Sequence, residues 1–150
     1  MTPKEKTKQK LQSYTKVLRE CGHLAEQLTR VESAMLSPKI QALDGMPHGS
    51  GGGDPLADVV STHLELVEKY KQKLANCWQL LDEVETLISG LDDPTERTLA
   101  RLRYIDGFTW EEICFKMTYS WPQVHRIHSR VLDKLAAQYI EKTEDEGAAV

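Results

Sequence analysis

Residues 93–137, DPTERTLARLRYIDGFTWEEICFKMTYSWPQVHRIHSRVLDKLAA, divide into three segments with helical periodicity. The first ends at a break at Gly107 and Phe108, and the second is the short run TWEEICFKM. A turn at Thr118 and Tyr119 then leads into the longest segment. A short helix, a tight turn and a longer helix are typical of a helix-turn-helix. We expect the apolar side chains of all three segments to share one core: Leu99, Leu102, Ile105, Ile113, Met117, Val124, Ile127, Val131 and Leu135.

Capping residues mark five helix starts along the chain. Four starts have Ser, Thr or Asp followed three residues later by Glu or Gln, the spacing of a capping box: Thr2, Asp93, Thr109 and Ser120. Asp54 before Pro55 marks the fifth. Gly90 and Gly107 follow periodic segments, where a left-handed residue commonly closes a helix. No segment alternates as a strand does, so the predicted fold class is all-α.

Two long helices are predicted before this region, over residues 3–36 and 55–89. Each carries apolar residues three and four apart, the spacing of a coiled-coil seam. In the first helix the seam comprises Leu11, Tyr14, Leu18, Cys21, Ala25 and Leu28, followed by a phase change to Val31 and Met35. In the second it runs without a break through Leu56, Val60, His63, Val67, Tyr70, Leu74, Cys77, Leu81, Val84 and Ile88.

The seam of each long helix needs a partner. The glycine-rich stretch 37–53, SPKIQALDGMPHGSGGG, cannot sustain a helix and is long enough to connect an antiparallel hairpin. The alternative partner is the same helix of another subunit. Further apolar residues beside the second seam, Trp78 and Leu80 among them, favour contact between more than two helices, so we expect a homo-oligomer, namely a dimer.

The predicted organisation has three parts. Residues 1–90 form a helical hairpin or coiled-coil region with the linker at 37–53, and residues 91–140 form the trihelical helix-turn-helix domain. Residues 141–150, EKTEDEGAAV, form an acidic tail that we expect to be disordered.

Composition limits the class of protein. The chain has 150 residues, of which 40% are hydrophobic and 28% charged, and a formal net charge of -4. This charge argues against indiscriminate coating of nucleic acid. No apolar run is long enough to span a membrane and no signal-peptide core follows the N-terminus, so we expect a cytoplasmic protein with no membrane partner. The three cysteines are far apart and odd in number, and we expect reduced thiols.

The last helix of residues 93–137 carries the candidate DNA-binding residues. Its N-terminal part would present side chains to base edges in the major groove of double-stranded DNA. The predicted DNA-binding residues are Trp121, Gln123, His125, Arg126 and Arg130, with Lys116 and Arg103 from the two preceding segments. Over residues 93–137, seven lysines and arginines stand against six acids, so the prediction depends on where the cations lie and not on excess charge.

Residues from Glu96 to Leu135 resemble region 4 of bacterial sigma factors, the promoter-recognition domain. TLARLRYIDGFTWEEI is similar to that family's leucine-arginine-tyrosine, glycine and threonine-x-glutamate-glutamate-isoleucine pattern, and the likeness continues to the Val-Leu-x-Lys-Leu ending. More loosely, the whole chain resembles a family of small phage and prophage proteins of Gram-positive bacteria. They combine a coiled-coil-like half, a Met-Pro-x-Gly linker (here residues 46–49) and a sigma-like helix-turn-helix. The resemblance implies a DNA-binding regulator of phage transcription in a bacterial host.

Three residues depart from the sigma-like pattern. Thr118 stands in the turn where glycine is usual, and Trp121 and Pro122 begin the recognition helix where polar residues are usual. A tryptophan lacks the paired hydrogen bonds that identify a base. Direct base recognition is therefore expected mainly from Gln123 and its neighbours His125 and Arg126.

Two alternatives to DNA binding remain open for this chain. The protein could instead dock on RNA polymerase or a host sigma factor without contacting DNA bases, or could be a DNA-packaging small subunit. No Ser/His/Asp or paired-carboxylate arrangement points to an enzyme. His125, His128 and Cys114 do not form a closed zinc-ligand set, and GSGGG lacks the ending of a phosphate loop. We therefore expect no enzyme activity, no metal and no cofactor.

Overall fold

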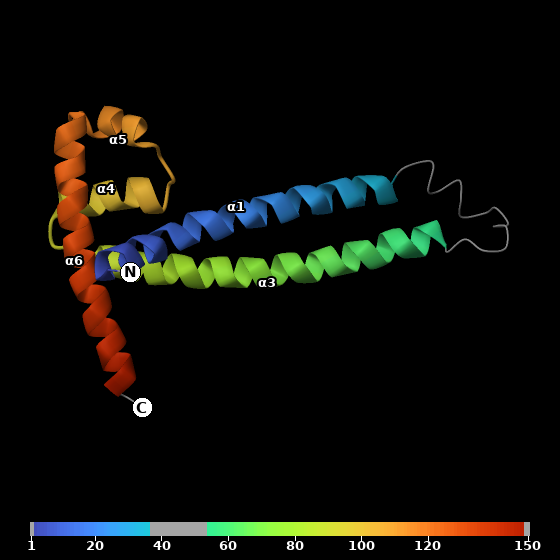
Figure 1. Ribbon diagram of the computed structural model, residues 1–150. Helices are drawn as coiled ribbons and strands as arrows, with labels where there is room; N and C mark the ends of the chain where they lie inside the picture. Colours follow the sequence, from blue (N-terminus) through green and yellow to red (C-terminus); the bar gives the residue numbers. More distant parts are fainter. Residues whose placement is uncertain (1, 37–53, 149–150) are drawn as a thin grey trace. The chain divides into compact units, whose positions relative to one another are not determined.

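The structure, a computed structural model, describes residues 2–36 and 54–148 (Figure 1). These residues form five α-helices and no strand, which confirms the all-α prediction. The predicted linker and its Met46–Gly49 motif lie outside the described residues. Within the described ranges, no helix combines the length and apolar character that crossing a membrane requires.

The helix bounds follow the capping signals closely. The helices are α1 (Pro3–Met35), α3 (Pro55–Ser89), α4 (Pro94–Tyr104), α5 (Trp110–Met117) and α6 (Trp121–Ala148). The difference is at the C-terminal end, where α6 continues through most of the tail that we expected to be disordered. The tail residues through 148 are exposed, so local helix preference and not packing accounts for this extension.

The predicted capping boxes form to different extents. At α1 the box is complete: the Glu5 N–H donates to Thr2 Oγ1 at 3.2 Å, and the Thr2 N–H donates to Glu5 Oε2 at 2.8 Å. At α4 only half of it forms. Asp93 accepts from the Thr95 N–H at 2.9 Å, but the Glu96 side chain is buried and pairs with Lys134 on α6. A tertiary ion pair has replaced the local hydrogen bond.

Two glycines were expected to be left-handed helix ends. Gly107 has a φ of 75°, as predicted. Gly90 does not have a positive φ, so that prediction is wrong. A Cβ there would lie 2.5 Å from Gln138 Oε1, so the end of this flexible side chain would have to shift and its hydrogen bond to the Gly90 carbonyl, 2.8 Å long, would be disturbed.

The chain divides into two compact units by its internal contacts. Unit 1 comprises residues 1–16 and 78–150, and unit 2 comprises residues 17–77. The start of α1 and the end of α3 therefore belong to the same unit as α4, α5 and α6. The domain boundary that we predicted near residue 90 lies inside unit 1.

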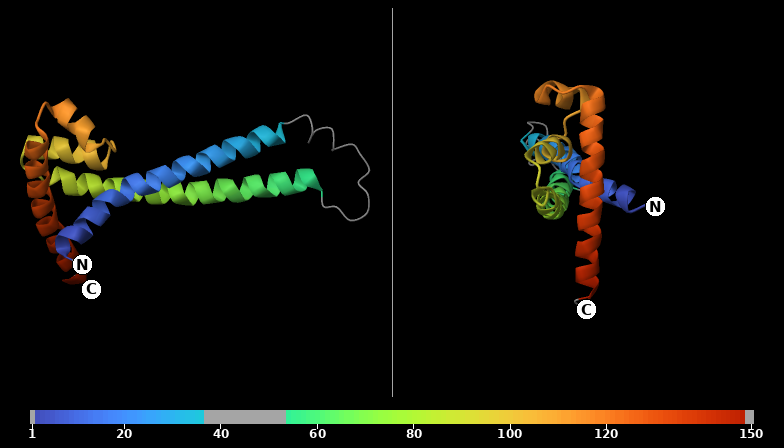
Figure 2. Two further views of the ribbon diagram at one scale, coloured as in Figure 1. Left: turned by 45° about the horizontal axis from the view of Figure 1, so that its top comes forward. Right: turned by 90° about the vertical axis from the view of Figure 1, so that its left-hand side faces the viewer.

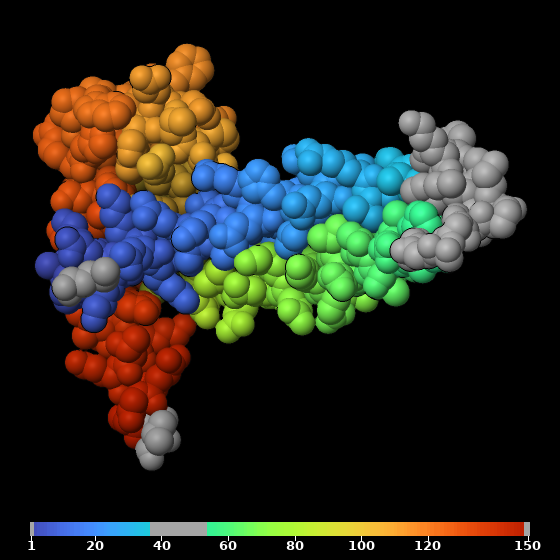
Figure 3. Space-filling model, turned by 45° about the vertical axis from the view of Figure 1, so that its right-hand side comes forward, coloured from blue at the N-terminus to red at the C-terminus, as the bar shows by residue number. Residues whose placement is uncertain are grey.

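In unit 2, the α1 and α3 segments lie side by side and run antiparallel (Figure 3). Lys73 pairs with Glu20 at 2.7 Å, and His63 lies 3.2 Å from Glu32. Among the described residues of this unit, only Cys21 and Cys77 are buried.

The seam of α1 differs in phase from the prediction. Leu18 is 44% exposed, whereas Val17 and Leu24 are half-buried. A seam through Tyr14, Val17, Cys21 and Leu24 keeps a regular spacing of three and four and continues to Val31 and Met35. No phase change is then needed.

The core of unit 1 is aliphatic and draws on every helix. Apolar side chains that are at most 1% exposed come from both long helices, from the connection between α3 and α4, and from α4, α5 and α6: Leu11, Val84, Ile88, Leu91, Leu99, Ala100, Ile113, Val124, Val131 and Leu135. Each of α4, α5 and α6 contacts the other two. The start of α1 and the end of α3 thus complete the packing of the C-terminal helices.

We predict that mild oxidation links Cys21 to Cys77 within one chain. Cys21 and Cys77 are both buried and are neighbours, because burial, followed by the charge of Cys21, raises the pKa of Cys77. A raised pKa slows thiolate formation, so the prediction depends on the proximity of the two thiols. After diamide treatment of a Cys114→Ser variant, peptide mass spectrometry should find the 21–77 disulfide in a species of monomer mass on a non-reducing gel. Cys77→Ser is the control. A covalent dimer carrying the same disulfide would contradict the intramolecular pairing.

Candidate nucleic-acid interface

The connection between α5 and α6 is a tight turn closed by backbone hydrogen bonds (Figure 2). Thr118 ends α5 in the left-handed conformation, with φ 59° and ψ 38°. The Thr118 N–H donates to the carbonyl of Phe115, and the Tyr119 N–H to that of Cys114 at 3.1 Å. A β-branched residue is strained in this region of φ and ψ. A glycine at this position would relieve that strain.

The packing of α6 separates an inner face from an outer one. Val124, Ile127 and Val131 are buried against the neighbouring helices. Three predicted residues of this helix are exposed on the other side: Gln123, Arg126 and Arg130. A surface groove on this helix is lined by Gln123, Arg126, Ile127, Ser129 and Arg130. We call it the α6 groove. Its lining holds two guanidinium groups, an amide and a hydroxyl, and no acid.

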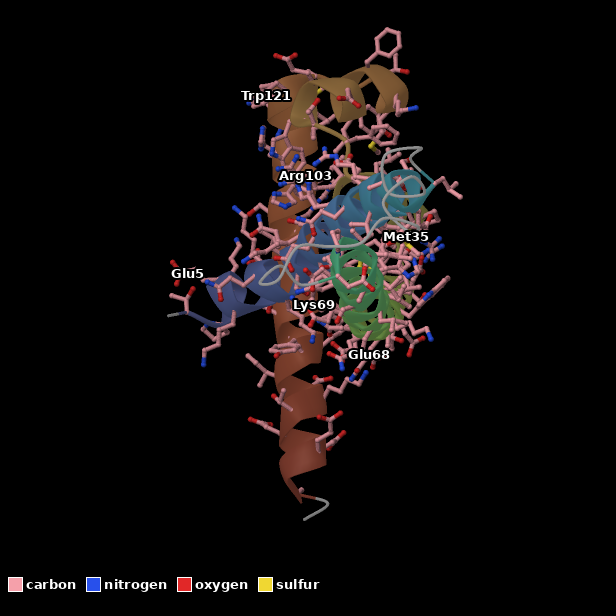
Figure 4. The ribbon with its side chains drawn as sticks, turned by 90° about the vertical axis from the view of Figure 1, so that its right-hand side faces the viewer. Glu5, Met35, Glu68, Lys69, Arg103 and Trp121 are labelled. Atoms are coloured by element: carbon pink, nitrogen blue, oxygen red, sulfur yellow. The ribbon has the colours of Figure 1, made fainter. Side chains whose placement is uncertain are left out.

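Trp121 and His125 belong to an aromatic cluster at the start of α6. The His125 ring lies 4.4 Å from the Trp121 ring and 5.0 Å from the Trp110 ring, centroid to centroid. The His125 Nε2 is buried without a hydrogen-bond partner among the described residues, and Trp121 stays 51% exposed (Figure 4). His125 therefore supports Trp121 through ring packing, with one ring nitrogen withdrawn from solvent.

Arg103 and Lys116 take part in contacts inside unit 1. The Arg103 guanidinium lies 4.4 Å from the centre of the Trp110 ring and donates to the Phe108 carbonyl at 3.0 Å. It closes the connection between α4 and α5. The Lys116 ammonium lies 4.6 Å from the centre of the Phe108 ring. The structure thus brings three of the seven predicted residues together in the α6 groove, two in the aromatic cluster at the start of α6, and these two at the connection between α4 and α5.

A buried hydrogen bond below the cluster joins α4 to α6. The Tyr104 hydroxyl lies 2.5 Å from the His128 Nε2, and the Trp110 ring packs edge-on against His128 at 4.5 Å. Burial, followed by the positive charge of Lys8, lowers the pKa of His128 to about 4. Burial raises the pKa of Tyr104 to about 12. Both groups are therefore neutral at physiological pH.

Glu96 was predicted as a capping residue, and its tertiary role was missed. This carboxylate is 2% exposed and accepts from the Lys134 ammonium at 3.0 and 2.8 Å. The Arg130 Nε lies 3.9 Å from it. Glu96 thus neutralises Lys134 and tethers α6 to α4. Glu96 and Lys134 are 38 residues apart, so no local sequence pattern predicts that they pair.

Lys4 was not among the predicted site residues, because its contacts are with a helix more than 120 residues away in sequence. Its ammonium lies 3.1 Å from Asp133 Oδ1 and 3.3 Å from Ser129 Oγ, both on α6. Ser129 lines the α6 groove. The first turn of α1 is therefore adjacent to the candidate interface. Across residues 2–36 and 54–148, no three His, Cys, Asp or Glu side chains are grouped so that they could hold a metal ion.

We predict that His128 makes unit 1 less stable in mild acid. Its pKa is near 6.5 when unfolded and about 4 when folded, so between these values the unfolded chain binds more protons. The free energy of unfolding is therefore highest above about pH 6.5. It falls as the pH is lowered and is smaller by roughly 2 kcal/mol at pH 5. Urea unfolding followed by circular dichroism at pH 7.5, 6 and 5 measures this loss.

His128→Gln should remove most of that pH dependence, because a glutamine can still accept from Tyr104 but does not titrate. His23→Gln, at an exposed histidine of unit 2, is the matched control and should keep it. An unchanged pH dependence in His128→Gln would show that other groups are responsible.

Comparisons with protein-family models, curated proteins and solved structures give no significant match to this chain. The likeness to sigma region 4 therefore depends on the sequence pattern quoted above, and it stays a prediction.

Proposed function

We propose that this protein is a sequence-specific double-stranded DNA-binding regulator of phage transcription. In this proposal α5 and α6 form a helix-turn-helix, and the first turns of α6 enter the major groove. The protein acts by binding and has no catalytic role.

The observation that carries the proposal is the outer face of α6. Gln123, Arg126 and Arg130 are exposed there and line one groove with no acid among its residues. Gln pairs well with adenine and Arg with guanine in the major groove. The capped N-terminus of this helix also favours a nearby phosphate, because the helix dipole is positive at that end.

The finer architecture is part of the proposal. We propose that α1 and α3 form an intramolecular antiparallel hairpin, that α4, α5 and α6 form the trihelical domain, and that two copies of the chain associate through unit 2. Support for association comes from the apolar side chains that unit 2 leaves exposed: Leu18, Val60 and Leu64. Light scattering should therefore give the mass of a dimer.

Arg126→Ala should weaken binding to a preferred duplex by roughly 1–3 kcal/mol if this side chain contacts a base. The duplex is first selected from a randomised double-stranded library with the wild-type protein. Affinities are then measured by fluorescence anisotropy for the selected duplex and for a scrambled one.

Arg19→Ala is the matched control, since Arg19 is an exposed arginine of unit 2. It should leave the affinity for both duplexes unchanged. Arg126→Ala should lower the affinity for the selected duplex more than for the scrambled one. Failure of the wild-type protein to bind any duplex at low salt would refute the proposed function.

A second candidate is a protein-interaction module that docks on RNA polymerase or a sigma factor. Phe115 favours it, because this large apolar side chain on α5 is 87% exposed. Isolated apolar residues are common on surfaces, but aromatic ones are enriched at interfaces.

Phe115→Ser should abolish co-purification with bacterial RNA polymerase if this second candidate is right, with no change in DNA affinity. Ile140→Ser, at a 38% exposed apolar residue near the end of α6, is the control. Equal recovery of polymerase with wild type and with Phe115→Ser would remove the support that Phe115 gives.

A further inference from the structure

Four lysines alternate with other residues at the start of α1: Lys4, Lys6, Lys8 and Lys10. An α-helix turns about 100° per residue, so Lys4 and Lys8 are about 40° apart and lie on one face, while Lys6 is about 160° from each. The run therefore presents two different faces.

The face of Lys4 is directed to α6. Its ammonium contacts Ser129 Oγ at 3.3 Å and Asp133 Oδ1 at 3.1 Å. Because Ser129 also lines the α6 groove, Lys4 lies at the rim of that groove. Asp133 is the acid nearest to this rim along α6, and Lys4 offsets its charge. The Lys4 side chain keeps 43% of its surface exposed and can still meet an anion.

Lys8 lies one turn further along the same face and is exposed. Its positive charge is among the causes that lower the pKa of His128, so its field reaches α6. Lys10 is different, because its ammonium pairs with Glu83 on α3. Lys6 is exposed on the opposite side of α1.

Resting on the proposed function, we propose that Lys4 and Lys8 contact the phosphate backbone of the DNA beside the segment that α6 enters. The first helix is then part of the DNA interface and not only a packing element. Ammonium groups suit this role, since they neutralise phosphates without distinguishing bases.

The test compares Lys8→Gln with Lys6→Gln, two substitutions that remove the same charge from exposed sites two residues apart. The affinity of each variant for the selected and the scrambled duplex is measured by fluorescence anisotropy at several salt concentrations. Each phosphate contact contributes about 0.9 to the slope of log K against log salt. Lys8→Gln should reduce the slope by about that amount and leave the preference between the duplexes unchanged. Lys6→Gln should match wild type.

Lys4 allows a second measurement. Lys4→Gln should weaken binding more than Lys8→Gln, because it removes a phosphate contact and also leaves the Asp133 carboxylate unneutralised next to the groove. Adding Asp133→Asn should restore part of the lost affinity. Thermal melts by circular dichroism check that all variants remain folded.

The outcomes separate the two proposals. If wild type binds DNA and Arg126→Ala weakens it, but Lys8→Gln and Lys6→Gln have the wild-type slope, the lysine inference is overturned and the proposed function stands. If wild type binds no duplex, the proposed function fails, and this inference fails with it.

Discussion

The inner face of α6 is the packing surface on which the rest of unit 1 depends. Its buried residues Val124, Val131 and Leu135 are contacted from several directions, because α4 and α5 both pack on this helix. Burying each such side chain contributes about 1.5–3 kcal/mol, so rotation of α6 about its axis would be very costly. With 3.6 residues per turn, fixing these residues inward leaves Arg126 and Arg130 outward. The same contacts that stabilise the unit therefore determine which side chains a partner meets.

Charge on α6 is largely balanced from neighbouring elements. Glu96 on α4 holds Lys134, and Lys4 on α1 offsets Asp133. These two pairs attach α6 to α4 and to α1, and both involve side chains far apart in sequence. The net charge over residues 93–137 is close to zero, but the positive and negative side chains lie in different places. Cations surround the α6 groove, and the Glu96 carboxylate is buried beneath them. The groove surface is positive because of where its cations lie, and not because the segment has excess positive charge.

Local rules predicted the elements well, and tertiary contacts explain where they failed. Capping boxes and periodicity placed the helix starts, since both depend on neighbours within one or two turns. Glu96 satisfied the capping pattern but was drawn into an ion pair with Lys134, which no local rule contains. Arg103 was predicted to bind DNA as a cation in a basic stretch, and its contacts with the Trp110 ring and the Phe108 carbonyl were not predicted. The contact of Lys4 with α6 could not be predicted from local sequence, since it depends on packing of the first helix against the last.

The small number of cations around the α6 groove limits the affinity that one copy of the chain could have for DNA. Lys134 is engaged by Glu96, and Lys116 and Arg103 pack on rings. Arg130 and Lys4 also have acidic neighbours, Glu96 and Asp133, but together with Arg126 and Lys8 they are the cations that the proposed binding mode would use. Lysine and arginine contacts to phosphates supply a large share of the affinity for duplex DNA. In the proposed binding mode, one copy of unit 1 supplies few of these contacts. Two copies would double the contacts and raise the effective concentration of the second once the first is bound. Association through unit 2 would therefore contribute to affinity, and the long helices would act in binding as well as in folding.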